Sequence, residues 1–430
     1  MSLLDELRQA LGPDAAAHVL TDPDLTEAFG TDWTRRWSTR PLAVVRPGSV
    51  DAVGAVLQAC RRHATPVVTQ GGNTGLVGAS VPQRPGEVLL STTRLHRLEP
   101  VDPVARQVTV GAGATLASVQ QHARSAGLVY GVDLAARESA TIGGTVATNA
   151  GGLRVCRFGD TRAQVTGLRA VLADGSVVDR LHGLPKDGAG YDLVALLVGS
   201  EGTLAVVTDV RVRLHEPDPR GVVTLVGCRS VAEAVSLLPA RGPGLRMAEL
   251  MTRDGLDLTC EAADLPFPLP SRWPAYLLLD TPDLPDLPEG IEAAVDARLV
   301  DYRERHPDAI ATLGVVHKYD VSLPLPRLDE FLDRVSARVA PHRLYVYGHL
   351  AEGNLHLGVV GPDPDDDQVD ATVLTLVAEM GGSIASEHGV GAAKAGLLGL
   401  NRSPADLAVM RAIKDALDPS GILNPGVVLV

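Results

Sequence analysis

The sequence predicts an α+β protein that is built from two domains. Short β-rich runs alternate with amphipathic helical patterns along most of the chain. The segment Glu216-Pro217-Asp218-Pro219 resembles a linker, because two prolines in four polar residues interrupt any regular element. The chain has 430 residues, and a single continuous core seldom grows that large. We therefore place a domain boundary at residue 217.

The composition is that of a globular protein, with 45% hydrophobic and 21% charged residues. Lys and Arg number 39 against 52 Asp and Glu, a net charge of −13, and no basic run offers a nucleic-acid surface. The four cysteines are far apart, which argues against a disulfide framework and a zinc ribbon. Early acids at the N-terminus and the lack of a long apolar run predict a cytoplasmic protein without an integral membrane segment.

The first domain begins with a βαβ-like pattern. A short strand at Val44-Val45 is followed by a helix that Ser49 can cap and that ends in the cations of Arg61-Arg62-His63. Pro66 then opens a strand at Val67–Thr69. Further expected elements are strands at Glu87–Ser91, Arg106–Val110 and Thr203–Leu214, a helix from Thr115 to Gly127, and a hairpin that turns at Ala173-Asp174-Gly175.

The second domain is expected to be a sheet with helices on one face. The acid-rich stretch 363–370 lacks the spacing of a calcium loop and is interpreted as a solvated loop before a helix at Val369–Met380. Ser403 and Pro404 begin a final helix. The other expected elements are strands at Gly221–Cys228, Ala275–Asp280 and Leu344–His349 and helices at Ser230–Leu238 and Ile291–His306.

A glycine-rich loop, Gln70-Gly-Gly-Asn-Thr-Gly-Leu-Val-Gly78, directly follows the strand at Val67–Thr69. Glycine permits positive φ, so successive backbone N–H groups can converge on an anion, and Asn73 and Thr74 add side-chain donors. The spacing matches neither the phosphate loop of nucleoside triphosphatases nor the dinucleotide loop of classical NAD sites. Taken alone, this loop is equally well explained as an ordinary turn.

Two further segments repeat the combination of glycine with Thr, Asn or Ser donors. They are Ala140–Gly152, which contains Ile142-Gly-Gly and Thr148-Asn-Ala-Gly-Gly, and Gly199-Ser-Glu-Gly-Thr-Leu204. Three such segments in one domain indicate backbone wrapped along an extended polar ligand such as a dinucleotide.

These three segments, with Arg46-Pro47, resemble the FAD-binding domain of flavoproteins of the vanillyl-alcohol-oxidase type. The closest resemblance is to the branch of D-2-hydroxyglutarate and D-lactate dehydrogenases, and it covers the chain from about Pro41 to the C-terminus. It implies an FAD-binding domain at 1–217 with its core at 41–217, and a substrate- and metal-binding cap domain at 218–400 with an antiparallel sheet. A C-terminal helix and tail at 401–430 would return to the flavin.

The resemblance also implies non-covalent FAD, because no histidine in these segments demands a covalent link. The loop Gln70–Gly75 would contact the pyrophosphate, and Gly143–Gly152 would lie near the ribityl chain and ring. The implied FAD contacts are Gln70, Gly71, Gly72, Asn73, Thr74, Gly75, Ser80, Leu134, Thr141, Gly143, Gly144, Thr148, Ala150, Gly152, Glu201, Gly202, Val207 and Asn424.

A second constellation surrounds the pattern His349-Leu-Ala-Glu-Gly-Asn-Leu-His356, which predicts a hairpin. If Leu350 faces Leu355 across the turn, His349 faces His356 and the two imidazoles can chelate one metal. The adjacent Glu387 and His388 offer a third ligand and a catalytic group, since neighbouring residues of an extended segment point to opposite sides. Paired histidines in a hairpin can also be purely structural.

The resemblance implies His349, His356 and Glu387 as ligands of a divalent metal, usually zinc, with His388 as the catalytic base that also contacts substrate. It implies Arg303 and Lys318 as contacts of the substrate carboxylates, although a solvated helix face explains Arg303 equally well from sequence alone. Gly358 stands where relatives commonly have Asn, and Pro307 offers no hydrogen-bond donor. Both departures put the identity of the substrate in question.

We therefore expect an FAD- and metal-dependent dehydrogenase that oxidises a D-2-hydroxy acid, with D-2-hydroxyglutarate as the first choice, by hydride transfer to flavin N5. Electrons would pass to an unidentified acceptor, either an electron-transfer protein or a quinone, and a homodimer is one oligomeric state we retain. The alternatives are a D-lactate or glycolate dehydrogenase or oxidase on the same scaffold, and a non-catalytic flavin-binding subunit with a structural metal.

Overall fold

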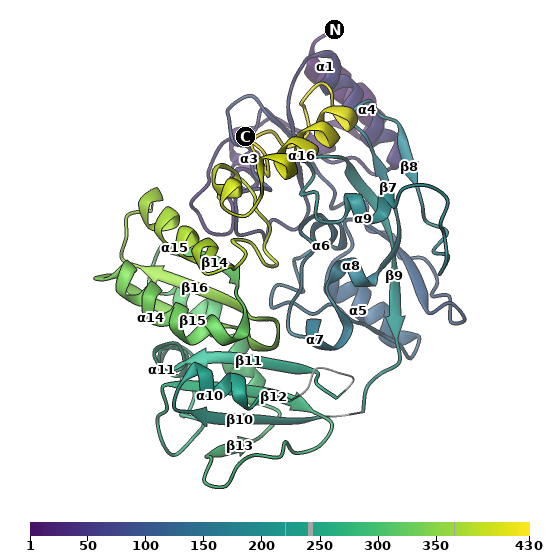
Figure 1. The fold of residues 1–430 in the computed structure, drawn as a ribbon. Helices are drawn as coiled ribbons and strands as arrows, with labels where there is room; N and C mark the ends of the chain where they lie inside the picture. Colours follow the sequence, from purple (N-terminus) through teal and green to yellow (C-terminus); the bar gives the residue numbers. More distant parts are fainter. Residues whose placement is uncertain (220, 240–243, 365) are drawn as a thin grey trace. The chain divides into compact units, whose positions relative to one another are not determined.

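The computed structural model describes residues 1–219, 221–239, 244–364 and 366–430. The chain forms two compact units (Figure 1). The first comprises Met1–Gly151, Asp160–Pro217 and Glu387–Val430, and the second comprises Gly152–Gly159 and Asp218–Ser386. The α+β class predicted from the sequence is confirmed.

The first unit contains two sheets. In one, of order β1-β2-β4-β3, the strands β2, β4 and β3 run parallel and β1 is antiparallel to β2. The other is antiparallel with the order β5-β9-β7-β8, and β6 pairs with β9. The strands are β1 (Val19–Leu20), β2 (Ala43–Val45), β3 (Val67–Gln70), β4 (Val88–Ser91), β5 (Gln107–Gly111), β6 (Val129–Tyr130), β7 (Val165–Val171), β8 (Val177–Asp179) and β9 (Val206–His215).

The helices of the first unit begin where the sequence provides caps. Ser49, Thr115 and Ser403 each accept a hydrogen bond from a backbone N–H in the first turn of α4, α5 and α16, which confirms the three predicted starts. The α-helices described in this unit are α1 (Leu3–Leu11), α2 (Ala15–His18), α3 (Pro23–Gly30), α4 (Val50–Arg62), α5 (Leu116–Ser125), α6 (Ile142–Thr148), α8 (Thr161–Gln164), α9 (Leu193–Leu197) and α16 (Pro404–Leu417).

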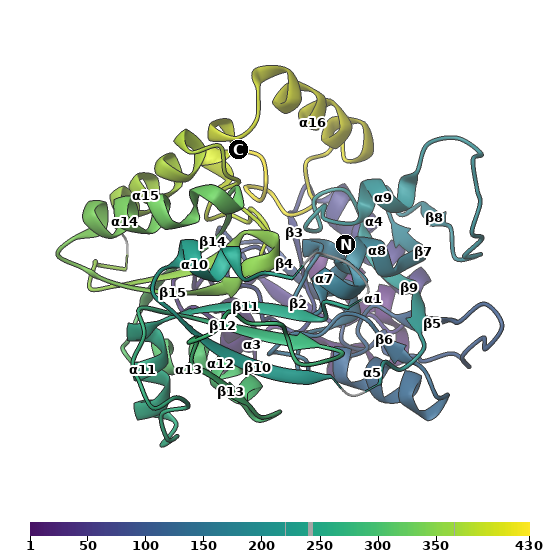
Figure 2. The same ribbon diagram turned by 60° about the horizontal axis from the view of Figure 1, so that its bottom comes forward.

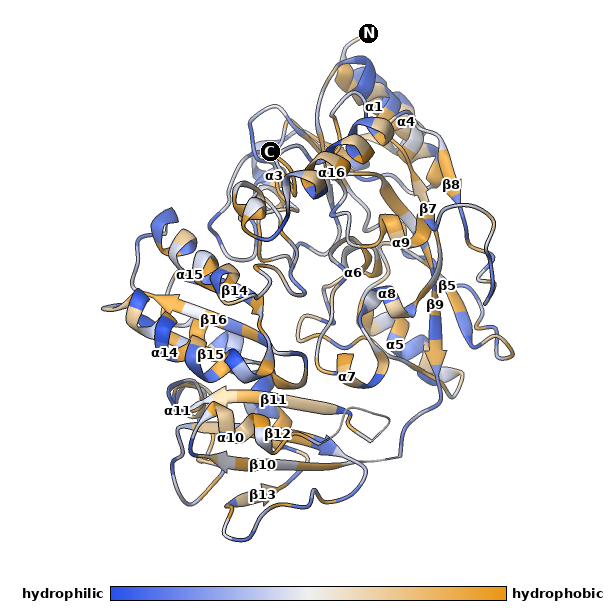
Figure 3. Cartoon of the chain, viewed as in Figure 1, coloured by the Kyte–Doolittle hydropathy of each residue, from blue (hydrophilic) through white to orange (hydrophobic). Residues whose placement is uncertain are grey.

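The helices pack on the sheets through their apolar faces. In α4, Val53, Val56, Leu57 and Cys60 are buried, which is the apolar face that the sequence predicts. Figure 3 shows blue and orange residues alternating along α16, whose Ile413 and Leu417 pack against the core cluster of the antiparallel sheet. Within the described ranges, none of the helices combines the length and the apolarity needed to cross a membrane.

The second unit is built on one antiparallel sheet of order β13-β10-β12-β11-β15-β16-β14. Its described strands are β10 (Val222–Cys228), β11 (Met247–Thr252), β12 (Ala275–Thr281), β13 (Ala293–Val295), β14 (Val316–Ser322), β15 (Arg343–His349) and β16 (Asn354–Val360). Its described α-helices are α7 (Val155–Phe158), α10 (Val231–Ser236), α11 (Arg253–Ala262), α12 (Leu299–Glu304), α13 (His306–Ala311), α14 (Leu328–Val339) and α15 (Asp367–Glu379).

Helices cover both faces of this sheet, so the expectation of helices on one face is wrong (Figure 2). Successive residues of β14 show the two sides. Val316 packs with Ile310 of α13, whereas the side chain of its neighbour His317 contacts Asp370 of α15. The strands are buried on both faces because each of their alternating sides meets a layer of helices.

The helix expected at Ile291–His306 is also wrong in its first half. Residues Ala293–Val295 form the edge strand β13, which pairs with Thr224–Val226 of β10, and the helix α12 begins only at Leu299. The alanines favour a helix locally, but pairing with an exposed sheet edge stabilises the extended form.

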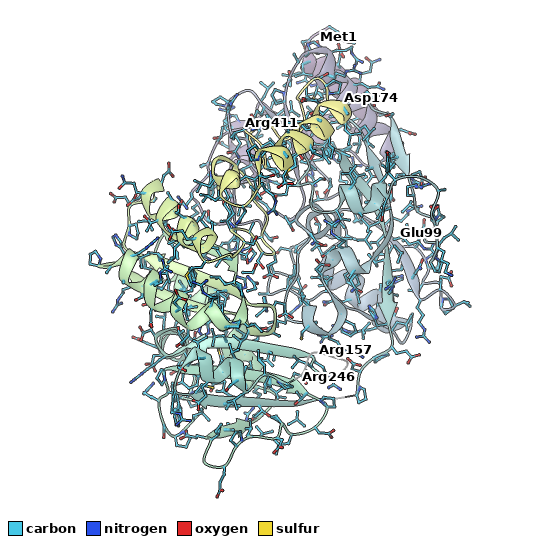
Figure 4. The ribbon with its side chains drawn as sticks, in the orientation of Figure 1. Met1, Glu99, Arg157, Asp174, Arg246 and Arg411 are labelled. Atoms are coloured by element: carbon cyan, nitrogen blue, oxygen red, sulfur yellow. The ribbon has the colours of Figure 1, made fainter. Side chains whose placement is uncertain are left out.

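The units divide the chain differently from the predicted domain ranges in two places. Residues 152–159 belong to the second unit. Both carboxylate oxygens of Asp218 accept hydrogen bonds from the Arg157 guanidinium, at 3.0 and 2.8 Å, and Arg246 lies close to the same carboxylate (Figure 4). Residues 387–400 belong to the first unit instead of the cap domain, because the carboxylate of Glu201 accepts the backbone N–H groups of Val390 and Gly391.

Candidate active site

The loop after β3 presents a row of backbone N–H donors. The backbone nitrogens of Gly71 through Gly75 donate to no acceptor in the described chain. The Asn73 side chain braces the loop, because its Nδ2 donates to Thr31 O at 2.8 Å and its Oδ1 accepts from Ser80 Oγ at 2.9 Å. Asn73 itself has a φ of 53°. Such a turn, with several N–H groups left to donate, suits a diphosphate.

The first two glycine segments pack backbone against backbone. A side chain at Gly71 would collide with Oγ1 of Thr141, and one at Gly72 would collide with the carbonyl oxygen of Ser139. Thr141 caps α6, and its Oγ1 accepts from Gly144 N at 3.3 Å. Glycine is therefore required at these positions by close approach of the backbones.

The third glycine segment joins the other two through one side chain. Asn424 accepts from Thr69 N at 3.0 Å with its Oδ1, while its Nδ2 donates to Glu201 O at 2.8 Å and to Ala79 O at 3.2 Å. The backbone nitrogen of Glu201 also donates to Ala147 O at 2.8 Å. Apart from Gly152, the three segments predicted to contact the dinucleotide thus meet inside the first unit, and they fit FAD through the N–H row and the close glycine backbones.

The carboxyl group of Glu201 lies at the same place and is buried. Burial raises its pKa to about 7, although the N–H groups of Val390 and Gly391 and the cation of Lys394 favour its charged form. Among the remaining predicted FAD contacts, Leu134 packs beside the core cluster, Val207 is buried in β9, Thr148 and Ala150 follow Gly144 around α6, and Gly152 is counted with the second unit.

The hairpin predicted for the second unit forms, but the strand register that we predicted for it is wrong. His356 pairs with Tyr347 instead of His349, because the 3-10 turn η3 (Leu350–Glu352) and Gly353, at a φ of 67°, widen the connection. The shift is two residues, which leaves both histidines on one sheet face. Their ring centroids lie 5.2 Å apart in an edge-to-face arrangement. Two imidazoles are therefore brought together, as the predicted metal site would require.

A buried acid that the sequence analysis did not single out holds His349 in place. Glu249 of β11 is paired with His349 across the sheet, and its Oε1 lies 2.7 Å from His349 Nδ1. Its Oε2 accepts from Nε of Arg303 at 2.7 Å. Burial would raise the pKa of Glu249, but its contacts with His349 and Arg303 hold it below the ordinary value. The site therefore contains an ionised carboxylate.

A second acid, Asp320, was also missed and neighbours His356. It is paired with His356 across β14 and β16, and its Oδ1 lies 3.6 Å from His356 Nδ1. Asn354 donates to Oδ1 at 2.8 Å, and the backbone of Ser386 donates to Oδ2 at 2.9 Å. Two imidazoles with carboxylates are the donor set that Zn²⁺ prefers, so the residues present fit that metal.

Among the predicted substrate contacts, Lys318 lies on the sheet and Arg303 on α12. Lys318 precedes Asp320 by two positions, and burial lowers the pKa of its ammonium to about 8 even though Asp308 favours the charged form. Gly358 lies opposite Lys318, and a side chain there would press on Ile310 and Val316. Pro307 lies in the first turn of α13. A side chain at position 358 would thus meet the apolar Ile310 and Val316 first, with Lys318 as its cross-strand neighbour.

Glu387 and His388 open the last segment of the first unit, with Nε2 of His388 3.7 Å from Oε1 of Glu387. They directly follow Ser386, which the second unit anchors to Asp320. Their roles as metal ligand and base remain predictions.

One signal in the sequence could have identified Glu249 and Asp320. Each is a single acid inside a strand-like run, Met247-Ala-Glu-Leu-Met and Val316-His-Lys-Tyr-Asp-Val. Because both faces of the sheet are buried, a charge in such a run has to be paired. The partner cannot be read from the run, since it lies on a different strand.

The chain is similar to known flavoproteins over both units. Residues 41–180 match the FAD binding domain family, and residues 218–428 match the family of C-terminal domains of FAD linked oxidases. A D-2-hydroxyglutarate dehydrogenase of Xanthomonas citri pv. viticola is 36% identical over 96% of this chain and 94% of its own length. The mitochondrial D-2-hydroxyglutarate dehydrogenase of Bos taurus is 37% identical over 95% and 80%.

Solved structures share the fold at low sequence identity. p-Cresol methylhydroxylase with substrate bound superposes with a TM-score of 0.77 at 17% identity, covering 99% of this chain and 95% of its own. 4-Ethylphenol oxidase from Gulosibacter chungangensis superposes with a TM-score of 0.78 at 18% identity, covering 100% and 96%. Given the N–H row, the glycine contacts and this full-length similarity, the chain belongs to the family of FAD-linked oxidoreductases that contains the D-2-hydroxyglutarate dehydrogenases.

Proposed function

We propose that the protein is an FAD-dependent dehydrogenase that oxidises a D-2-hydroxy acid to the 2-keto acid, with D-2-hydroxyglutarate as the first candidate. The observation that carries this proposal is the similarity to D-2-hydroxyglutarate dehydrogenases over nearly the whole chain. The group of two histidines, two acids and Lys318 on the sheet, together with Arg303 of α12, supports it, because an anionic hydroxy acid needs cations for its carboxylate and a group that activates its hydroxyl.

Each group then has a distinct task. Bound FAD would supply the hydride acceptor for this oxidation. His349, His356 and Glu387 would hold a divalent cation such as Zn²⁺, which would supply Lewis acidity for the substrate hydroxyl. Arg303 and Lys318 hold the carboxylate, and His388 takes the hydroxyl proton. The role of Glu387 is taken from the resemblance of the motif Ser386-Glu387-His388-Gly389.

Arg303 is free to contact an acid with its terminal nitrogens. Glu249 accepts a hydrogen bond from Nε of Arg303 alone. Within the described residues, the two terminal nitrogens of Arg303 donate no hydrogen bond, and neither of them is among the fully buried atoms that lack a partner. The guanidinium carbon lies 4.6 Å from the ring centroid of Tyr347, which restricts the plane of the group.

One observation favours a smaller substrate, such as D-lactate or glycolate. Gly358 is surrounded by Ile310, Val316 and Tyr345, so this part of the sheet face offers a distal carboxylate no polar side chain from position 358. Another observation favours a non-catalytic subunit. Asp320 lies beside His356, and a fourth protein ligand would close a metal site to substrate.

Anaerobic mixing of the FAD-loaded protein with the D and L forms of 2-hydroxyglutarate, malate, lactate and 2-hydroxybutyrate separates these candidates. Bleaching of the flavin by D-2-hydroxyglutarate supports the main proposal, and bleaching by D-lactate alone supports the smaller substrate. A flavin that none of these acids reduces contradicts both. Oxygen consumption after reduction distinguishes an oxidase from a dehydrogenase that passes electrons to a protein or a quinone.

His388→Ala tests the assignment of the base. We expect flavin reduction to slow by at least about 100-fold, because general base catalysis contributes that much or more, while FAD stays bound. His96→Ala is the matched control, since His96 is exposed on a loop of the first unit. If the His388→Ala variant reduces its flavin as fast as the control does, His388 is not the catalytic base. The measurement is the anaerobic stopped-flow rate.

A further inference from the structure

The second unit contains a carboxylate that links two functional side chains. Glu249 is 1% exposed and sits in the middle of β11, while the side chains of His349 and Arg303 are each 6% exposed. One oxygen faces His349 Nδ1 and the other faces Arg303 Nε, both at 2.7 Å. A buried carboxylate needs such partners, and here its two partners are a proposed metal ligand and a proposed substrate contact.

We infer that Glu249 is a positioning residue that couples the proposed metal ligand His349 to Arg303. Arg303 is called the clamp below, because it is proposed to hold the carboxylate of the substrate. This inference rests on the proposed function and deepens it. Glu249 touches neither the reacting atoms nor the metal in this assignment. It acts through the two side chains that do.

The effect on His349 follows from the chemistry of the contact. Arg303 can only donate to Glu249, so we take Glu249 as an acceptor on both oxygens and assign the proton to the ring nitrogen that faces it, Nδ1. The lone pair of the neutral imidazole is then on Nε2, which becomes the ligand atom. Carboxylates that hold metal-binding histidines in this way also fix the orientation of the ring and raise its basicity.

The effect on Arg303 is one of orientation. The guanidinium is planar, so a bond at Nε together with the Tyr347 ring over its face fixes the plane in which the terminal N–H groups point. Arg303 stands on α12 and His349 on β15, and Glu249 lies between them on β11. The same carboxylate therefore sets the direction of the metal ligand and of the clamp.

Glu249→Gln tests this coupling with little change of shape. The amide oxygen accepts from only one of the two donors, and the NH₂ group faces the other. If it faces His349, the imidazole proton moves to Nε2 and the ligand atom is blocked. If it faces Arg303, the clamp loses its fixed plane. We expect Zn²⁺ affinity to fall about 10- to 100-fold and KM to rise more than kcat falls.

The matched control is Asp370→Asn, which removes a similar contact on the opposite face of the same sheet. Oδ1 of Asp370 lies 2.9 Å from Nδ1 of the buried His317 and accepts from the Tyr319 hydroxyl at 2.6 Å. We expect this variant to lose stability and to keep the Zn²⁺ affinity of the wild type. Zn²⁺ affinity is measured on the FAD-loaded proteins by competition with a chromophoric chelator, and folding is checked by circular dichroism.

The outcomes separate the coupling from the proposed function. Wild-type protein that binds no Zn²⁺ overturns the metal site and this inference with it. Zn²⁺ binding by the wild type that Glu249→Gln leaves within twofold, with an unchanged KM, overturns only the inference. Should Glu249→Gln fail to fold, ¹⁵N NMR of metal-free wild type, with His349 assigned from His349→Gln, decides. A proton on Nδ1 supports the coupling, and a proton on Nε2 overturns it.

Discussion

At the scale of single residues, the proposed substrate contact Lys318 gives a prediction about pH. It lies in a strand whose two faces are packed, and burial lowers the pKa of its ammonium to about 8. Below pH 8 the side chain is mainly charged, and above pH 8 it is mainly neutral. An anionic substrate bound through Lys318 therefore loses its cation on the alkaline side, well before an exposed lysine would titrate.

We predict that kcat/KM falls about tenfold per pH unit above pH 8, because this ratio reports groups of the free enzyme. In Lys318→Arg the fall should move beyond the accessible range, since a guanidinium stays charged. Lys318→Met should lose activity at pH 7 and show no such alkaline limb. The rate of anaerobic flavin reduction at low substrate gives the profiles. An alkaline limb shared by wild type and Lys318→Met would assign it to another group.

At the scale of the elements, local chemistry predicted starts and turns, and long-range pairing decided the rest. The caps at Ser49 and Ser403 act through neighbouring residues, so the sequence alone predicted them. The strand at Ala293–Val295 exists because β10 offers it an edge, and the register of the β15–β16 hairpin depends on a turn with a 3-10 segment. Neither partner is visible in the local pattern.

The same division holds for the candidate site. His349, His356 and the glycine segments were found because each carries a recognisable residue type in a short motif. Glu249 and Asp320 were missed because each acquires its role from a strand far away in the sequence, with Glu249 lying 100 residues from His349. Arg303 was found as a cation, but its buried contact with Glu249 could not be read from its own helix.

The C-terminal helix α16 gives the element-scale prediction. Lys414 donates to Thr203 O and Leu423 O, both at 2.8 Å, and pairs with Asp418, whose side chain is fully buried. Lys414→Met leaves Asp418 without its cation. We expect a loss of about 3 kcal/mol, at the lower end for a buried pair because 18% of the Lys414 side chain is exposed.

FAD affinity should fall as well, since Asn424 follows directly on the segment that Lys414 holds. Arg229→Ala is the matched control, because Arg229 and Glu233 form a pair with the same spacing on an exposed surface, where little stability is expected to be lost. Urea unfolding and FAD titration provide the two measurements. Equal stability of Lys414→Met and Arg229→Ala would mean that the buried pair contributes nothing.

At the scale of the whole molecule, the two units are interleaved along the chain. The first is assembled from three segments and the second from two, so the chain passes between them at 151–152, 159–160, 217–218 and 386–387. Neither unit is one continuous stretch of sequence. Apart from Gly152, the three glycine segments and Asn424 nevertheless fall in the first unit, which means that nearly all groups proposed to hold FAD fold together.

This arrangement predicts where FAD binding slows hydrogen exchange. The backbone N–H groups of Gly71 through Gly75 have no acceptor in the described chain, so they should exchange rapidly without FAD and slowly once phosphate oxygens accept from them. The N–H groups of β10 and β12 already pair within their ladder and should change least. Exchange mass spectrometry with and without FAD compares the two sets of peptides. Protection that spreads evenly over both units, or that spares Gly71–Gly75, would contradict the assignment of this loop to the diphosphate, because the N–H groups of the loop are the ones expected to gain acceptors.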